Sequence, residues 1–171
     1  EKNIFGSGNT LNAELKISES FNKIIFYFMN PNFNDEGHSI SFGAFKSEIN
    51  DDEIADNSYE VNTTGISFGY GIPLTNKTRI NTGVEYSDNE IKCSDLFSAS
   101  AYESSQCANK DNDEFKLNVN WDKNTLNDYL YPTDGANNSL SFGVALPGGD
   151  YRYYNLTADH KSYKPINEKT T

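Results

Sequence analysis

The 171-residue sequence predicts an all-β fold, an antiparallel up-and-down transmembrane β-barrel of about eight strands. Three observations support this prediction. Apolar and polar residues alternate along nearly the whole chain, which is the period of a strand and not of a helix. The polar positions carry Lys, Glu, Asp, Asn and Ser in mid-strand, as the lumen face of a barrel does. Aromatic residues make up 13% of the chain and gather near strand ends, where an interfacial girdle is expected.

Eight segments of about ten residues, long enough to cross a bilayer as tilted strands, show this alternation in turn. Their apolar faces are Leu11–Ile17, Ile24–Phe28, Ile40–Ala44, Thr64–Tyr70, Ile80–Tyr86, Phe115–Trp121, Leu140–Leu146 and Tyr154–Ala158. The residues expected to face lipid are Leu15, Phe26, Phe42, Phe68, Val84, Leu117, Val119, Phe142, Val144 and Leu156. The expected aromatic girdle consists of Tyr70, Tyr86, Trp121 and Tyr154. A soluble β-sandwich alternates in the same way and stays open as an alternative.

The connectors between these segments indicate which side of the membrane each end faces. Bacterial barrels join their strands by short periplasmic turns and longer external loops. The odd-numbered connectors, residues 19–22, 47–58, 87–113 and 147–151, include two acidic loops, and we assign this side as extracellular. The sixth connector, residues 124–137, is long for a periplasmic turn.

The net charge and the two cysteines argue against two functions, nucleic-acid binding and metal binding. The formal net charge of −11 and the pI near 4.5 argue against nucleic-acid binding, because that function needs a basic face. The two cysteines, Cys93 and Cys107, lie in a polar, Ser-rich stretch far from either histidine. An extracytoplasmic disulfide is therefore predicted in preference to a metal site, and two free thiols are the alternative.

The other short motifs indicate no catalytic or ligand-binding site. The acidic clusters Asn50–Glu53 and Asp111–Glu114 lack the spacing of a calcium-binding EF-hand loop, so solvated loops are the better interpretation. Gly69-Tyr70-Gly71 lacks the third glycine of a dinucleotide loop. Neither His38 nor His160 stands beside an evident nucleophile. No enzymatic activity and no cofactor are expected.

The most specific signals are turns that occur in a fixed order: Asn3–Asn9, Asn30–Gly37, Tyr131–Gly135, Leu146–Asp150 and Tyr163–Ile166. This ordered set resembles the BamA family of bacterial outer-membrane protein assembly factors and spans nearly the whole chain. The resemblance places six residues in periplasmic turns: Asn30, Pro31, Gly37, Pro132, Asp134 and Gly135. One departure lies in the long turn, where the family usually has Asp and this chain has Asn127, with Asp128 one position later. Its hydrogen bonding is expected to differ locally.

The resemblance implies that residues 1–171 are a single segment of a transmembrane barrel domain, about the third to tenth of the family's sixteen strands. The periplasmic domains and the remaining strands are then absent from the chain. The implied function is the folding and insertion of β-barrel proteins in the bacterial outer membrane, without a nucleotide or metal. The implied partners are outer-membrane lipid, unfolded outer-membrane protein clients, and accessory lipoproteins that bind the absent periplasmic domains.

Two alternatives belong to other classes. One is a passive or transporting barrel, which is either a translocator of the two-partner secretion type or a small self-contained outer-membrane barrel. Against the self-contained form, the chain does not end on an aromatic strand terminus. The other is a soluble secreted β-domain that binds a ligand or a surface.

Overall fold

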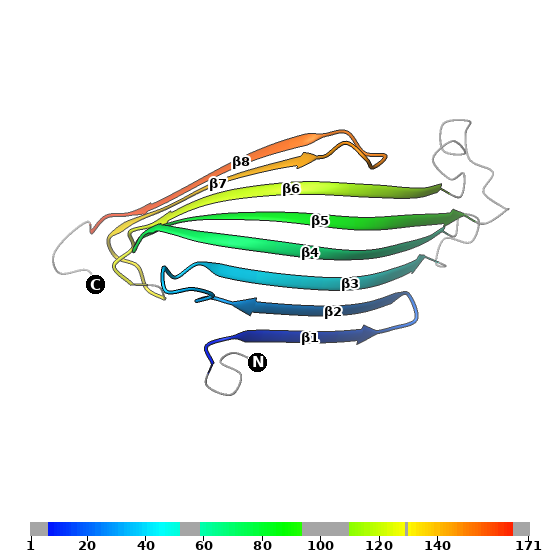
Figure 1. Ribbon diagram of the computed structural model, residues 1–171, viewed down its shortest axis with the longest axis horizontal. Coiled ribbons are helices and arrows are strands. Elements are labelled where there is room, and N and C mark those ends of the chain that lie inside the picture. The colour runs from blue at the N-terminus through cyan, green and yellow to red at the C-terminus, as the bar shows by residue number, and fades with distance from the viewer. Residues whose placement is uncertain (1–6, 52–58, 94–109, 129, 166–171) are drawn as a thin grey trace.

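Eight β-strands follow one another along the chain and pair in the same order, each antiparallel to the next (Figure 1). The computed structural model describes residues 7–51, 59–93, 110–128 and 130–165. The strands are β1 (Thr10–Ile17), β2 (Phe21–Asn30), β3 (Ser39–Asp51), β4 (Tyr59–Thr75), β5 (Thr78–Cys93), β6 (Lys110–Asn124), β7 (Gly135–Ala145) and β8 (Tyr154–Tyr163). The predicted all-β, up-and-down fold is confirmed. No helix long and apolar enough to span a membrane is found among the described residues.

The sheet is a single layer with two open edges. Within the described residues, β1 pairs only with β2 and β8 only with β7, so the sheet does not close on itself. No described side chain is fully buried, and the large apolar residues stay exposed along the sheet. The eight-stranded sheet, which we call the wall, therefore has no buried core of its own, and its stability depends on what covers each face.

The pairing register is regular from β1 to β8, with one shift in β4 between Pro73 and Thr75. Because side chains alternate between faces, an unbroken register keeps every residue of a cross-strand row on the same face. Residues on one face are mostly exposed, whereas those on the other are mostly half-buried, as expected where a curved sheet crowds its inner side. We call these the outer face and the inner face.

Strands β3 to β6 are longer than the alternation predicts, with 13, 17, 16 and 15 residues. The loop boundaries predicted around residues 47–51, 87–93 and 110–113 are wrong, because all of these lie in strands. The cluster Asp111–Glu114 is likewise part of β6 and not a loop. Backbone pairing does not require an apolar face, and here the outer face carries ion pairs instead. Lys46 Nζ, for example, lies 2.7 Å from Glu48 Oε1.

The sheet has two ends. One end carries the β1–β2, β3–β4, β5–β6 and β7–β8 connectors, and we call it the loop end. The other, the turn end, carries three connectors: the β2–β3 turn, the β4–β5 turn and the β6–β7 turn (Figure 1). The β4–β5 turn is shorter than predicted, because β4 continues to Thr75 and leaves only Asn76 and Lys77 between the strands. The β6–β7 turn covers residues 125–134, close to its predicted extent.

Candidate functional site

The ten residues expected to face lipid all lie on the outer face. The register links them directly: Phe42 pairs with Phe68, Phe68 with Val84, and Val84 with Leu117. Seven of the ten are exposed, up to 66% at Leu15 and Leu156, whereas Leu117, Val119 and Val144 are half-buried. The structure therefore brings the ten together on one surface, and their contact with lipid stays a prediction.

The apolar part of this face has the height of a bilayer core. On β4 it runs over nine residues, from Ile66 to Leu74. At about 3.4 Å per residue and a tilt of about 40°, that length spans about 23 Å along the membrane normal. Outer-membrane barrels carry an apolar band of about 25 Å. We call the cross-strand rows of the outer face that pass through Ile66 to Leu74 of β4 the apolar band.

Two tyrosines of the outer face bond to polar groups. Tyr70 lies midway along the apolar band on β4, and its hydroxyl lies 2.6 Å from Nδ1 of His38, at the end of the β2–β3 turn. Near the loops, the hydroxyl of Tyr86 donates to Asp113 Oδ1 at 2.7 Å. An aromatic body on the apolar side and a hydroxyl on the wet side is the arrangement of residues at a membrane interface.

The inner face is polar and built from small residues. From β3 to β8 one row reads Ser41, Gly69, Gly83, Asn118, Gly143 and Asn155, and it continues to Met29 on β2 and Thr10 on β1. Longer polar side chains on this face bond across strands. Arg79 Nη1 donates to Ser39 Oγ at 3.0 Å, and Asn81 Nδ2 donates to Asp122 Oδ2 at 3.3 Å. A face with this chemistry is compatible with a hydrated lumen and not with lipid.

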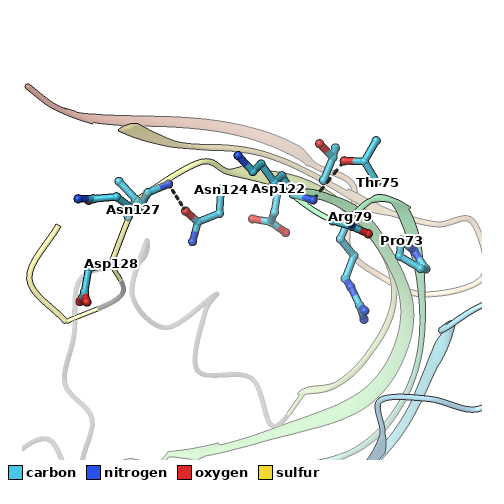
Figure 2. A pocket seen from close by; sticks show the side chains of 11 residues that line it. Pro73, Thr75, Arg79, Asp122, Asn124, Asn127 and Asp128 are labelled. Carbon is cyan, nitrogen blue, oxygen red and sulfur yellow. Dashed lines mark hydrogen bonds between the residues drawn. The ribbon is translucent and has the colours of Figure 1, made fainter. Parts of the chain in front are cut away.

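A polar hollow of about 580 Å³ lies at the turn end of the sheet, lined by residues of β4, β5, β6 and the long turn. Figure 2 shows Arg79 and Asp122, from neighbouring strands, projecting to the same side of the sheet, with Asn127 and Asp128 of the long turn farther along, beyond Asn124. Its lining charges are mixed in sign, with Lys77 and Arg79 against the two aspartates. The hollow therefore favours neither an anion nor a cation.

The long β6–β7 turn is held by two side chains. Asn127 Oδ1 accepts the backbone N–H groups of Thr133 and Asp134, each at 3.0 Å, and its amide donates to Thr133 Oγ1 at 2.7 Å. Asp128 Oδ1 accepts the N–H groups of Leu130 and Tyr131, which lowers the pKa of the Asp128 carboxyl. The departure from the family pattern thus leaves a well-bonded turn, in which the Asn amide itself accepts the backbone donors.

Gly135 ends this turn and has to be glycine. Its φ angle is +102°, in the region that other residues rarely adopt. A side chain there would also run into the backbone of Thr125, whose carbonyl carbon lies 2.8 Å from the position of an added Cβ. The strand β7 can therefore begin directly behind the turn only with glycine at this position.

The β2–β3 turn lies at the same end of the sheet. Asn30 Oδ1 accepts the N–H of Asn32 at 3.0 Å, Asn34 Oδ1 accepts that of His38 at 2.9 Å, and Gly37 has φ of +76°. All six residues predicted for periplasmic turns therefore lie in or beside two turns at one end of the wall: Asn30, Pro31, Gly37, Pro132, Asp134 and Gly135.

One feature that the sequence pattern did not predict is the packing of the β7–β8 loop on β6. The N–H of Asp150 donates to the carbonyl of Asp113 at 2.7 Å, and Asp150 Oδ2 accepts the N–H of Asp113 at 2.9 Å. The hydroxyl of Tyr153 bonds Glu114, which raises the pKa of Tyr153 to about 12. The pair Gly148-Gly149 is the sequence feature that could have indicated this packing, because the backbone of Asp113 leaves no room for a Cβ at Gly149.

Several predictions fall outside the described residues. Cys107 and the side chain of Cys93 are among these, so the disulfide stays a prediction, as does the structure of Asp52 and Glu53. In the part of the chain that is described, no group of three or more His, Cys, Asp or Glu residues is placed to hold a metal ion. His160 Nδ1 lies 2.6 Å from Asn138 Oδ1 and not beside a nucleophile.

Comparison with known proteins gives consistent results. A family model described as the Omp85 superfamily domain matches residues 3–171. The chain is similar to the outer membrane protein assembly factor BamA of Neisseria meningitidis serogroup B, with 22% identity over 183 aligned residues that cover 100% of this chain and 23% of that protein. Among solved structures it is similar to BamA from Haemophilus ducreyi lacking POTRA domains 1–3, with a TM-score of 0.75 and 21% identity over 98% of this chain and 34% of that one. The predicted resemblance is confirmed, and the chain spans about a third or less of the length of these relatives.

Proposed function

The chain belongs to the Omp85 superfamily, and from this premise we propose that it is a wall segment of a BamA-type insertase that folds and inserts β-barrel proteins. Its location is the bacterial outer membrane, as for the other members of its family. The observation that carries the proposal is the unbroken eight-strand wall, apolar on one face and polar on the other, which matches a BamA barrel over 98% of the chain.

The two open edges support the view that residues 1–171 are one segment of a larger barrel domain. Within the described residues, β1 and β8 each have a partner strand on one side alone, and a sheet edge without a partner strand is costly in lipid, because no water is there to satisfy its backbone groups. Further strands, supplied by the rest of the protein, would pair with both edges and close the barrel. In this proposal the periplasmic domains likewise belong to the rest of the protein.

The proposed role of this segment is mechanical and needs no cofactor or catalytic residue. It holds the barrel's shape in the bilayer, while the seam where clients pair would be formed by other strands of the same barrel. An unpaired strand edge can template an incoming strand, so clients would add there as unfolded outer-membrane proteins. Accessory lipoproteins would dock on the periplasmic domains, at the end of the wall that carries the β2–β3 and β6–β7 turns.

Depletion of the full-length protein in its own bacterium tests this function. The readout is the amount of a heat-modifiable porin that reaches its folded form in the outer membrane. The proposal expects folded porin to fall together with other β-barrel proteins, and to recover when the full-length protein is supplied again. Normal porin assembly combined with loss of one secreted passenger would instead identify a two-partner secretion translocator.

A further inference from the structure

The outer face is not evenly filled, because an apolar hollow of about 430 Å³ opens on it across β3 to β6. Its walls are outward-facing residues of the apolar band: Phe42, Ile66, Phe68, Val84, Tyr86 and Phe115. The volume lies within the range of roughly 300–1,000 Å³ that is typical of small-molecule sites.

Two aromatic pairs standing beside shorter side chains produce this hollow. The rings of Phe42 and Phe68 have centroids 5.2 Å apart on β3 and β4, and those of Tyr86 and Phe115 lie 4.7 Å apart on β5 and β6. Ile66 pairs with Tyr86, and Val84 pairs with Phe68, so the two shorter residues lie between the aromatic pairs. The result is a trough with aromatic sides and an aliphatic floor.

The hollow lies in the half of the apolar band nearest the loops. Tyr86 and Phe115 form the last apolar row in that direction, and the next outer-face row contains Lys46, Asp88 and Asp113. With the turns facing the periplasm, this half of the band meets the outer leaflet. The position of the hollow is thus continuous with the lipid-facing surface.

The rim next to the hollow is polar and mixed in charge. Asp113 accepts a hydrogen bond from Tyr86 and retains further acceptor capacity. Lys46 bonds Glu48, yet its side chain is 53% exposed and keeps donors free for a phosphate. The two carboxylates can accept from the hydroxyl groups of a sugar headgroup, and the ammonium of Lys46 can donate to its phosphate.

We propose that this hollow seats one acyl chain of an outer-leaflet glycolipid, whose hydroxyl- and phosphate-bearing headgroup lies against the row of Lys46, Asp88 and Asp113. The site rests on the proposed orientation of the wall in the membrane, and it adds a specific lipid to that function. Burial of the chain between the aromatic pairs supplies apolar contact, while the rim distinguishes a sugar headgroup from a phospholipid.

The test uses the full-length protein and a filled-in hollow. Val84→Trp places a large apolar side chain in the trough, and Val144→Trp is the matched control, because both valines belong to one cross-strand row of the outer face and Val144 does not line the hollow. Each protein is placed in nanodiscs of rough lipopolysaccharide and, separately, of phosphatidylethanolamine. Lipid that stays bound after mild detergent extraction is counted by native mass spectrometry.

The proposal expects Val84→Trp to reduce retained lipopolysaccharide about tenfold, the equivalent of losing roughly two buried methylenes, with Val144→Trp unchanged. Lys46→Gln, which leaves the trough intact, should reduce retention by a smaller factor. Equal retention in the two Trp variants, or retention of phosphatidylethanolamine equal to that of lipopolysaccharide, would overturn it. Porin assembly is measured on the same proteins. If the wild-type protein retains lipopolysaccharide but does not assemble porin, the proposed function is contradicted and this site still stands.

Discussion

The two faces of the wall are built from the same eight strands by alternate residues, yet they obey opposite rules. On β6, Leu117 and Val119 belong to the apolar band, while their neighbour Asn118 belongs to the polar inner face. The apolar band of the outer face excludes charge because nothing in a bilayer solvates it, whereas the inner face excludes bulk where neighbouring strands approach closely. Tolerance to substitution therefore depends on which face a residue points to, and so on whether its position along the strand is odd or even, more than on its place along the strand.

A charge on the outer face gives the largest expected effect. Phe142→Lys and Leu117→Lys are predicted to cost about 2–4 kcal/mol in the free energy of unfolding, because both residues lie in the middle rows of the apolar band. Asn118→Lys, one residue away on the inner face, is the matched control and should be mild. Urea unfolding of the full-length protein in lipid vesicles measures all three. Equal costs at the three positions would mean that the two faces are not distinguished by lipid.

Added bulk on the inner face gives the next effect. A methyl group at Gly65 would meet the ring of Phe45 and lie 2.9 Å from the carbonyl oxygen of Tyr86, so Gly65→Ala is predicted to cost about 1–3 kcal/mol. Gly43→Ala, on the same face, meets a Ser67 hydroxyl that can rotate away, and should cost less. The same unfolding titration compares them. A larger loss at Gly43 than at Gly65 would contradict this account of the inner face.

The distinction between faces should disappear in the turns, where both sides meet water. Asn127→Ala removes the acceptor of two backbone N–H groups in the long turn and is predicted to cost about 1–2 kcal/mol. Asn127→Asp keeps that acceptor and gives up only the bond to Thr133 Oγ1, so it should lose less. Thermal unfolding, followed as the loss of the compact band on unheated gels, would separate the two variants. Identical behaviour would mean that these backbone bonds contribute nothing.

The smallest expected effect is a change with pH in the β7–β8 loop. The bond to Glu114 raises the pKa of Tyr153 to about 12 from an ordinary value of 10.0. The contact therefore contributes fully below pH 10 and is lost as the pH rises through about 12. Ultraviolet titration of phenolate absorbance should show one late-titrating tyrosine, which Glu114→Gln moves to lower pH. An unchanged curve in that variant would exclude Glu114 as the cause.

The sequence predicted the fold class and the composition of both faces, because period-two alternation is fixed by strand geometry. The ten outer-face positions could be named without a structure for the same reason. The extent of β3 to β6 could not, since their outer faces change from apolar to charged at Lys46 and Asp88 while the backbone pairing continues. The packing of the β7–β8 loop on β6 also escaped prediction, because it depends on backbone contacts between Asp113 and Asp150 that leave little trace in composition.

Water accessibility along one strand tests the two-faced wall most directly. In the full-length protein with Cys93 and Cys107 replaced by serine, single cysteines are placed at each position from Lys116 to Asn120 and labelled in intact outer membranes with a water-soluble maleimide. We expect strong labelling at 116, 118 and 120, and protection at 117 and 119, which lie in the apolar band. Uniform labelling, or the opposite alternation, would contradict it.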